Sequence, residues 1–257
     1  MLSGYEKLTA TFTKLSREGT LGQGYLFFGD AGVGKSAFTR ALAAFLETGN
    51  WEEGERPLVD AVTLAPDEKG SIGIDAIRDL RRFLSQTPLS SPRRTAVITD
   101  AEALTDDAQS ALLKLVEEPA SRVLLLFSTS DPQALFAPLR SRLSRVYVPR
   151  LPRASLVAFL MERHGLTESK AARIAAVSFG RVGRALRIMG VIPEASIEGR
   201  ELEVEIEEAI LSLRAEGVGR NRAKLAWLLD REMLVKRFNL NPNLQRKAVR
   251  EVLAGRV

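Results

Sequence analysis

The first half of the chain alternates between short apolar runs and longer stretches in which apolar residues recur at helical spacing. The apolar runs predict strands at residues 25–28, 61–64, 95–99, 123–128 and 145–148. The helical spacing predicts helices at residues 36–46, 72–84 and 108–116. Strands separated by such helices favour a parallel sheet with right-handed crossovers, so we expect an α/β fold for residues 1–149.

The pattern changes after the sequence Pro149-Arg150-Leu151-Pro152. No later stretch has the character of a strand. Helical spacing instead predicts helices at residues 154–163, 168–178, 183–189, 200–215, 221–238 and 243–254. We therefore expect a small helical domain at residues 150–192 and a helical C-terminal region at residues 193–257.

A glycine-rich motif lies between the first predicted strand and the helix that follows it. It reads Gly29-Asp30-Ala31-Gly32-Val33-Gly34-Lys35-Ser36, and we call it the phosphate loop. The glycines let successive backbone N–H groups turn toward one anion, and the helix N-terminus adds its positive dipole end. Lys35 can reach the β- and γ-phosphates, and the Ser36 hydroxyl can bind Mg²⁺. The motif therefore predicts ATP or ADP with Mg²⁺ as the ligand.

Composition narrows the chemistry further. The chain has no cysteine, which excludes disulfides, thiolate zinc sites and cysteine nucleophiles, and its one histidine, His164, argues against a histidine-based metal site. The net charge of +5 suits contact with DNA or an acidic partner, and equally suits a solvated surface. The apolar runs are too short to span a membrane and no signal-peptide pattern is present, so we expect a cytoplasmic protein with no membrane partner.

Three more motifs point to a family. One is Ile72-Gly73-Ile74-Asp75-Ala76-Ile77-Arg78, a second is Thr105-Asp106-Asp107-Ala108-Gln109-Ser110-Ala111-Leu112-Leu113-Lys114-Leu115-Val116-Glu117-Glu118-Pro119, and the third is Pro138-Leu139-Arg140-Ser141-Arg142. With the phosphate loop, they resemble the clamp-loader branch of the AAA+ ATPases, as found in bacterial DNA polymerase III. The resemblance covers about residues 4–190. Beyond it, Asn239-Leu240-Asn241-Pro242-Asn243-Leu244 resembles the start of that family's last collar helix.

The resemblance implies a fold and a role. The fold is an AAA+ domain with a parallel sheet (residues 1–149), a helical lid (150–192) and a reduced, collar-like helical region (193–257). The role is that of one subunit in a hetero-oligomeric ring that opens a sliding clamp and places it on primer-template DNA. The implied partners are the other clamp-loader subunits, the clamp, and DNA contacted through the assembly. ATP sites in this family lie between subunits.

Arg142 belongs to the Ser-Arg motif, and by resemblance it is an arginine finger that acts in the neighbouring subunit's ATP site. A guanidinium suits that task because it offers a rigid fork of donors to phosphate oxygens. A surface arginine or an ion pair is the alternative interpretation. Arg140 and Arg145 lie close by in the sequence and are alternative choices for the finger.

The acidic pair that holds Mg²⁺ and orients water in active members of the family is incomplete. Counting back from Thr105 puts Thr99 at the metal-binding Asp position and Asp100 at the Glu position. Counting from the strand end makes Asp100 the metal Asp and puts Ala101 at the Glu position. Asp100 is thus a candidate Mg²⁺ ligand, and the alternative interpretation is that Asp100 and Glu102 are ordinary loop carboxylates.

The family's remaining site positions are marked less strongly. A hydroxyl that senses the γ-phosphate would fall near Thr129 and Ser130, and a second sensor arginine would fall near Gly183, with Arg184 one residue late. The cysteine-rich zinc module of many relatives is absent, so we expect no zinc.

Three hypotheses follow for function. The first is a clamp-loader subunit that binds nucleotide weakly or statically and donates Arg142 to a neighbour. The second is an autonomous AAA+ ATPase that uses Lys35, Ser36 and Asp100. The third is a P-loop kinase for a small molecule, against which the helical tail and the Ser-Arg motif argue.

Overall fold

A computed structural model of the chain describes residues 4–52, 57–192, 201–237 and 242–255. The chain forms two compact units, residues 1–186 and residues 187–257. Each unit is described by itself below.

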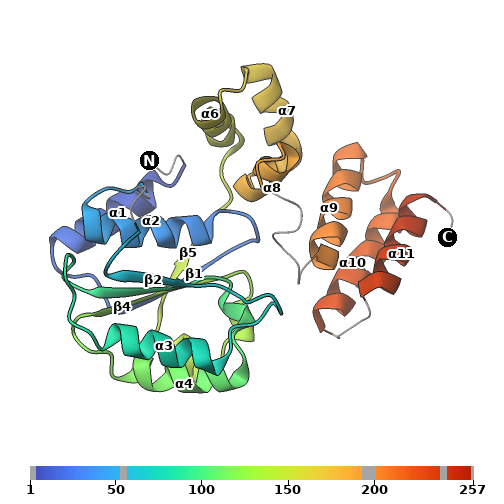
Figure 1. The fold of residues 1–257 in the computed structure, drawn as a ribbon. Helices are drawn as coiled ribbons and strands as arrows, with labels where there is room; N and C mark the ends of the chain where they lie inside the picture. Colours follow the sequence, from blue (N-terminus) through green and yellow to red (C-terminus); the bar gives the residue numbers. More distant parts are fainter. Residues whose placement is uncertain (1–3, 53–56, 193–200, 238–241, 256–257) are drawn as a thin grey trace. The chain divides into compact units, whose positions relative to one another are not determined.

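A five-stranded parallel sheet forms the centre of the first unit (Figure 1). Its strands follow the order β2-β3-β4-β1-β5 and span β1 Gly24–Phe28, β2 Ala61–Leu64, β3 Arg94–Ile98, β4 Val123–Thr129 and β5 Ser144–Tyr147. Each strand lies within a residue of its predicted bounds. All seven residues of β4 are buried because neighbouring strands flank it and helices cover both of its faces.

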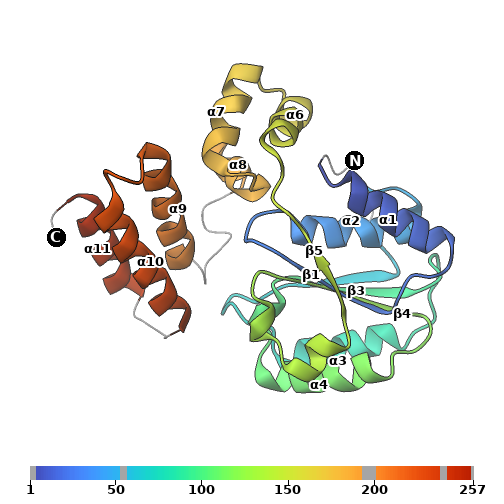
Figure 2. The ribbon, with the colours of Figure 1, turned by 180° about the vertical axis from the view of Figure 1, so that it is seen from behind.

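Helices cover both faces of the sheet, as Figure 1 and the view from behind in Figure 2 show. On one face lie α1 Glu6–Arg17 and α2 Lys35–Thr48, and on the other lie α3 Ile74–Leu84 and α4 Asp106–Glu117. The rings of Phe12, Phe27 and Phe38 meet on the first face with centroids 5.4 to 5.9 Å apart. Leu80, Leu112 and other buried residues fill the second face.

The structure adds elements that the sequence pattern did not predict. These are α1, the 3-10 turns η1 Ala101–Ala103 and η2 Pro132–Ala134, and the short helix α5 Ala137–Ser141. One predicted start was wrong: α3 begins at Ile74, not at residue 72. Ile72 stays extended because it forms a parallel bridge with Leu104, and Gly73 is the extended N-cap of α3.

Three helices follow the sheet: α6 Arg153–His164, α7 Glu168–Ser178 and α8 Val182–Ile188. Leu156 and Leu160 of α6 are buried, as are Ala171 and Ala175 of α7. We call residues 150–186 the lid segment. It belongs to the first compact unit, and α8 runs across the boundary between the two units.

The described part of the second unit holds α9 Glu201–Glu216, α10 Arg222–Arg237 and α11 Pro242–Leu253. Ile206, Leu228 and Val249, one from each helix, are buried together. Asn239-Leu240-Asn241, the start of the collar-like motif, lies outside the described residues. No helix in the described ranges has the length and hydropathy needed to cross a membrane.

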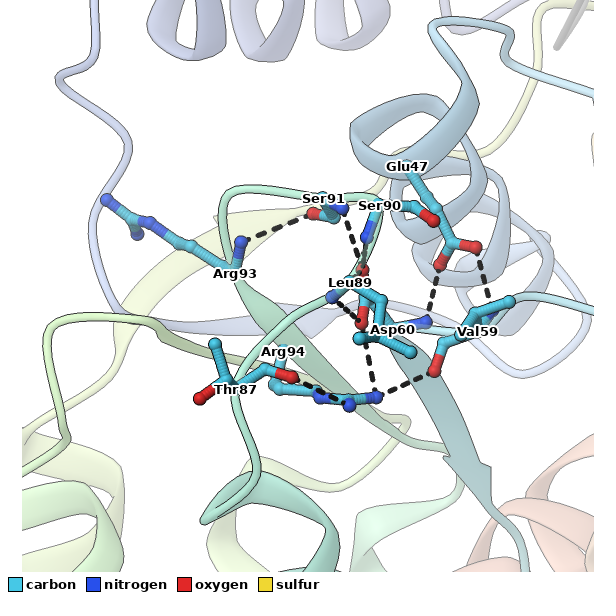
Figure 3. Close-up of polar contacts among 9 residues, drawn as sticks. All are labelled: Glu47, Val59, Asp60, Thr87, Leu89, Ser90, Ser91, Arg93 and Arg94. Atoms are coloured by element: carbon cyan, nitrogen blue, oxygen red, sulfur yellow. Dashed lines mark hydrogen bonds and ion pairs between the residues drawn. The ribbon is translucent and has the colours of Figure 1, made fainter.

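A buried ion pair fastens the edge of the sheet where β2 and β3 begin (Figure 3). Asp60 precedes β2, and its carboxylate lies 3.1 Å from Nη1 of Arg94, the first residue of β3. The same carboxylate accepts from the backbone N–H groups of Leu89, Ser90 and Ser91, and Arg94 donates to two backbone carbonyls. Burial alone raises the pKa of Asp60, but these donors and Arg94 outweigh it and hold the pKa below its ordinary value.

Candidate nucleotide-binding site

The phosphate loop lies at the carboxyl ends of the strands, between the end of β1 and the start of α2. Its three glycines, Gly29, Gly32 and Gly34, have φ values of +151°, +76° and +104°. These values favour glycine because a Cβ would clash there. The three glycines thus allow the tight turn between β1 and α2 that the motif requires, and the binding of phosphates by its N–H groups stays a prediction.

Lys35 begins α2 and is only 6% exposed. Its Nζ donates to the carbonyl oxygens of Gly29 at 3.0 Å and of Asp30 at 2.8 Å. The ammonium group thus lies against the loop itself. To reach a phosphate, it would exchange these carbonyls for phosphate oxygens, which are stronger acceptors for a cation.

Two other carbonyls of the loop are held from outside. The Gly32 oxygen accepts from the Gly183 N–H at 2.8 Å, and the Val33 oxygen accepts from the Tyr5 hydroxyl. Burial raises the pKa of Tyr5, so its hydroxyl keeps its proton at neutral pH. Carbonyls of such a loop point away from the anion that its N–H groups face, so these contacts stabilise the loop and leave its concave side to a ligand.

Asp30 places a carboxylate on the phosphate loop. Arg150 donates from Nε to Asp30 Oδ2 at 2.5 Å, and Arg181 Nη2 lies 3.9 Å from Asp30 Oδ1. The hydrogen bond from Arg150 is the main reason that the pKa of Asp30 is below its ordinary value, with further contributions from the charges of Arg150, Arg181 and Lys35. Asp30 is therefore ionised at neutral pH.

Ser36 in α2 and Asp100 after β3 are the two predicted Mg²⁺ ligands, and their surroundings are as follows. The Ser36 hydroxyl lies 3.2 Å from the hydroxyl of Ser128 in β4. At the end of β3 the buried residue is Thr99, whose hydroxyl donates to the Leu64 carbonyl at 3.1 Å. Asp100 comes next, is exposed, and has a left-handed backbone with φ of +48°. Within the described ranges, no group of three or more acidic, histidine or cysteine side chains is placed to hold a metal ion.

The two predicted sensor positions have well-defined partners. Ser130 donates from its backbone N–H and its hydroxyl to Glu102 Oε1, at 2.9 and 2.5 Å. Arg184 is buried, and its guanidinium lies 5.6 Å from the centre of the Phe179 ring. Glu102 therefore ties the turn after β3 to the turn after β4.

Arg142 lies at the end of α5, and its side chain is 40% exposed. Its Nη1 donates to the Pro138 carbonyl at 3.0 Å, and its Nη2 lies 2.8 Å from Oε1 of Glu117 in α4. Arg140 is held differently, by the Pro132 carbonyl and the Gln133 side chain. Arg142 thus forms an ion pair with Glu117 within this chain, and its side chain remains partly exposed to solvent.

The contacts separate what the sequence could predict from what it could not. The phosphate loop is visible in the sequence as a motif, and the predicted second sensor at Gly183 and Arg184 lies within three residues of Arg181. Tyr5, Ser128 and Arg150 were missed. Arg150 is 120 residues from Asp30, and no periodicity links two such positions. Only the fold brings them together.

The family described as DNA polymerase III, delta subunit matches residues 4–152. The chain is 32% identical over 180 residues to DNA polymerase III subunit gamma/tau of Mycobacterium tuberculosis (strain H37Rv), which is 63% of this chain and 31% of the relative. It is 36% identical over 132 residues to DNA polymerase III subunit delta' of Escherichia coli K12, which is 50% of this chain and 39% of the relative. The chain thus spans well under half the length of these two relatives.

Solved structures support the same fold. A DNA polymerase III gamma subunit-related protein of Thermotoga maritima superposes with a TM-score of 0.55 at 20% identity, covering 93% of this chain and 96% of that one. The RuvB Holliday junction branch migration motor of Thermotoga maritima superposes with a TM-score of 0.54 at 18% identity, covering 72% and 59%. The expectation of an AAA+ fold is confirmed.

Proposed function

We propose that this chain, which belongs to the DNA polymerase III delta subunit family, is a delta-prime-type subunit of a clamp loader in DNA replication. In this role it binds nucleotide weakly or statically and donates Arg142 to the ATP site of a neighbouring subunit. The observation that carries this function is that the buried residue at the end of β3 is Thr99, whose hydroxyl bonds the Leu64 carbonyl, in a chain whose phosphate-loop motif is complete. We expect such a domain to hold a nucleotide but to hydrolyse it poorly, because its acidic pair is incomplete.

The residues present fit a bound Mg²⁺–nucleotide in part. Lys35 and the loop glycines suit the phosphates, and Arg181 and Arg184 add cations on the side of the lid segment. Ser36 would hold Mg²⁺ through its hydroxyl, with Asp100 as a second ligand through water. The nucleotide would supply the polyphosphate charge that these cations bind. Ser130, by its place after β4, would sense the γ-phosphate.

Arg142 would work outside this chain. It is exposed at the end of α5, on an element held by the buried side chain of Gln109, which accepts from the Phe136 N–H and donates to the Ala134 carbonyl. Gln109 thus holds the start of α5, and Arg142 is the C-cap at the other end of this five-residue helix, from which its side chain would enter a neighbouring site. There it would exchange Glu117 for phosphate oxygens, which its fork of donors also fits.

The proposed partners are the other subunits of a hetero-oligomeric ring, and through them the sliding clamp and primer-template DNA. In the second unit, Leu229 and Met233 lie one turn apart on α10 and are 52% and 59% exposed. Two large apolar side chains on one helical face suit packing against a helix of a neighbouring subunit. We assign this face of α10 to the ring contact.

The test is ATP turnover by the clamp loader reconstituted with this chain and the ATPase subunits of the same organism. Arg142→Ala should abolish turnover at the facing site, where an arginine finger contributes on the order of a thousandfold. Arg145→Ala is the matched control, since Arg145 is a neighbouring exposed arginine that lies over the Phe28 ring. Unchanged turnover with Arg142→Ala, or an equal loss with Arg145→Ala, would refute the assignment.

The complete phosphate loop also favours a second function, that of an autonomous ATPase using Lys35, Ser36 and Asp100. Steady ATP hydrolysis by the isolated chain, lost in Lys35→Ala and reduced in Asp100→Asn, would establish it. Under our proposal the isolated chain binds nucleotide, and Lys35→Ala weakens this binding. Neither the unmodified chain nor the variant hydrolyses ATP.

A further inference from the structure

The phosphate loop contains a carboxylate, that of Asp30, next to the site where the loop is expected to bind phosphates. Asp30 directly follows Gly29, and its side chain is 37% exposed. A carboxylate beside a site for phosphates repels them, so its presence calls for a physical explanation. The cations around it provide one.

Those cations come from both ends of the lid segment. Arg150 lies just before α6, and Arg181 lies in the turn between α7 and α8. Both face Asp30, through the 2.5 Å hydrogen bond and the 3.9 Å ion pair. Arg181 is buried there, at 6% exposure, so its charge is desolvated and oriented toward the loop.

Backbone contacts join the same pieces. The Leu151 N–H donates to the Gly180 carbonyl at 2.9 Å, which brings the two arginine-bearing ends of the lid segment together. The Gly183 N–H donates to the Gly32 carbonyl, and a Cβ on Gly183 would come within 3.1 Å of Gly32 Cα. The lid segment is thus attached to the phosphate loop at two residues, Asp30 and Gly32.

We propose that Asp30 is an internal anion that fastens the lid segment to the phosphate loop in the nucleotide-free chain, and that the phosphates of a bound nucleotide compete with it for Arg150 and Arg181. The second half rests on the proposed nucleotide-binding function, while the first half does not. In the absence of nucleotide, Asp30 then keeps the lid segment attached to the phosphate loop. Its negative charge also lowers the affinity of the loop for phosphates.

The proposal predicts opposite effects on affinity for the two ends of one ion pair. Asp30→Asn removes a like charge and releases two arginines, so it should strengthen binding of Mg²⁺–ADP by about three- to tenfold. Arg150→Gln removes one of the two cations that balance the negative charge of Asp30. The carboxylate then repels the phosphates more strongly and the phosphates lose a cation, so binding of Mg²⁺–ADP should weaken by a similar factor. Both variants should loosen the lid segment when no nucleotide is present.

The experiment measures two quantities in the full chain. Hydrogen–deuterium exchange across residues 150–186 without nucleotide reports the attachment, with β3 as the internal reference. Isothermal titration with Mg²⁺–ADP reports affinity. Asp79→Asn is the matched control, because it removes an exposed carboxylate paired with Arg82 at 3.2 Å on α3 and should change neither quantity.

The expected result is faster exchange in both variants with affinity raised in Asp30→Asn and lowered in Arg150→Gln. Exchange equal to that of the unmodified chain in Asp30→Asn would overturn the attachment. Affinity that moves in the same direction in both variants would overturn the competition. If exchange responds as expected but no protein binds Mg²⁺–ADP, the attachment is supported, whereas the competition and the nucleotide-binding part of the proposed function both fail.

Discussion

Two carboxylate–arginine pairs lie at opposite ends of the parallel strands, one before the amino ends of β2 and β3 and one after the carboxyl end of β1, and they differ in burial. Asp60 and Arg94 are fully buried where β2 and β3 begin, and three backbone N–H groups complete the coordination of the carboxylate. Asp30 and Arg150 are 37% and 40% exposed where β1 ends. Separating a buried pair is costly because it leaves an unpaired charge in the protein interior. Separating an exposed pair costs little because water solvates both charged groups.

This difference in burial indicates which of the two ion pairs a ligand can open. The Asp60–Arg94 pair holds the loop at residues 87–91 through hydrogen bonds to Thr87, Leu89, Ser90 and Ser91 (Figure 3), and its burial keeps water from replacing either partner. The Asp30–Arg150 pair can open at little cost, and a ligand phosphate can take the place of the carboxylate. The parallel sheet thus has a buried ion pair at the amino ends of its strands and a replaceable, exposed one at the carboxyl ends.

The largest expected effect is on the buried pair. Asp60→Ala should lower the free energy of unfolding of the first unit by about 3–5 kcal/mol, since it leaves the Arg94 charge buried without its carboxylate. Asp30→Asn should lower it by less than about 1 kcal/mol. Urea unfolding of variants in a Trp227→Phe background measures this, because Trp51, stacked on Phe45, then reports the first unit alone. Equal losses in the two variants would contradict the comparison.

A smaller effect should follow from protonating Asp60 instead of removing it, because the neutral acid still fills the site. The pKa of Asp60 is lowered in the folded chain, so its contribution to stability is complete above the unfolded pKa of about 3.9 and is lost as the pH falls through the folded value. The stability difference between the unmodified chain and Asp60→Asn should therefore shrink below about pH 4. Thermal unfolding from pH 5 to pH 2 measures it, and a constant difference would contradict the assignment.

Local pattern accounts for what the sequence could and could not predict. β4 was recognised because every residue from Val123 to Ser128 except the last is apolar, and the phosphate loop was recognised because its motif is contiguous. α1 was missed although Phe12 is one of its buried residues. Asp60 and Arg94 were not singled out, since each stands alone among residues of ordinary character. Pairs of this kind depend on strand order, which no local pattern encodes.

The same reasoning applies to the incomplete acidic pair. The sequence left two alignments for the end of β3, and both lacked one carboxylate. The structure shows Thr99 buried and Asp100 exposed in the left-handed region, which only three-dimensional packing could reveal. The contact between the hydroxyls of Ser36 and Ser128 likewise joins the first turn of α2 to β4, two elements that are far apart in the chain.

The smallest expected effect is at the backbone contact beside the replaceable pair. In Gly183→Ala the new Cβ would lie 3.1 Å from Gly32 Cα and 3.2 Å from Gly32 O, so α8 must move away by a few tenths of an ångström. The cost of that strain, about 1 kcal/mol, is offset by the better helix propensity of alanine, also about 1 kcal/mol, so the unfolding free energy should hardly change. Amide exchange in residues 29–36 should nevertheless rise about two- to fivefold.

Gly73→Ala is the matched control for this substitution, since a Cβ there meets open space. It should leave exchange in the phosphate loop unchanged. If Gly183→Ala also leaves it unchanged, the close approach of α8 does not hold the loop, and Asp30 alone would carry the attachment of the lid segment. If exchange rises as expected, the loop is held by a tight backbone contact and an exposed ion pair together, and weakening either one should make the other easier to open.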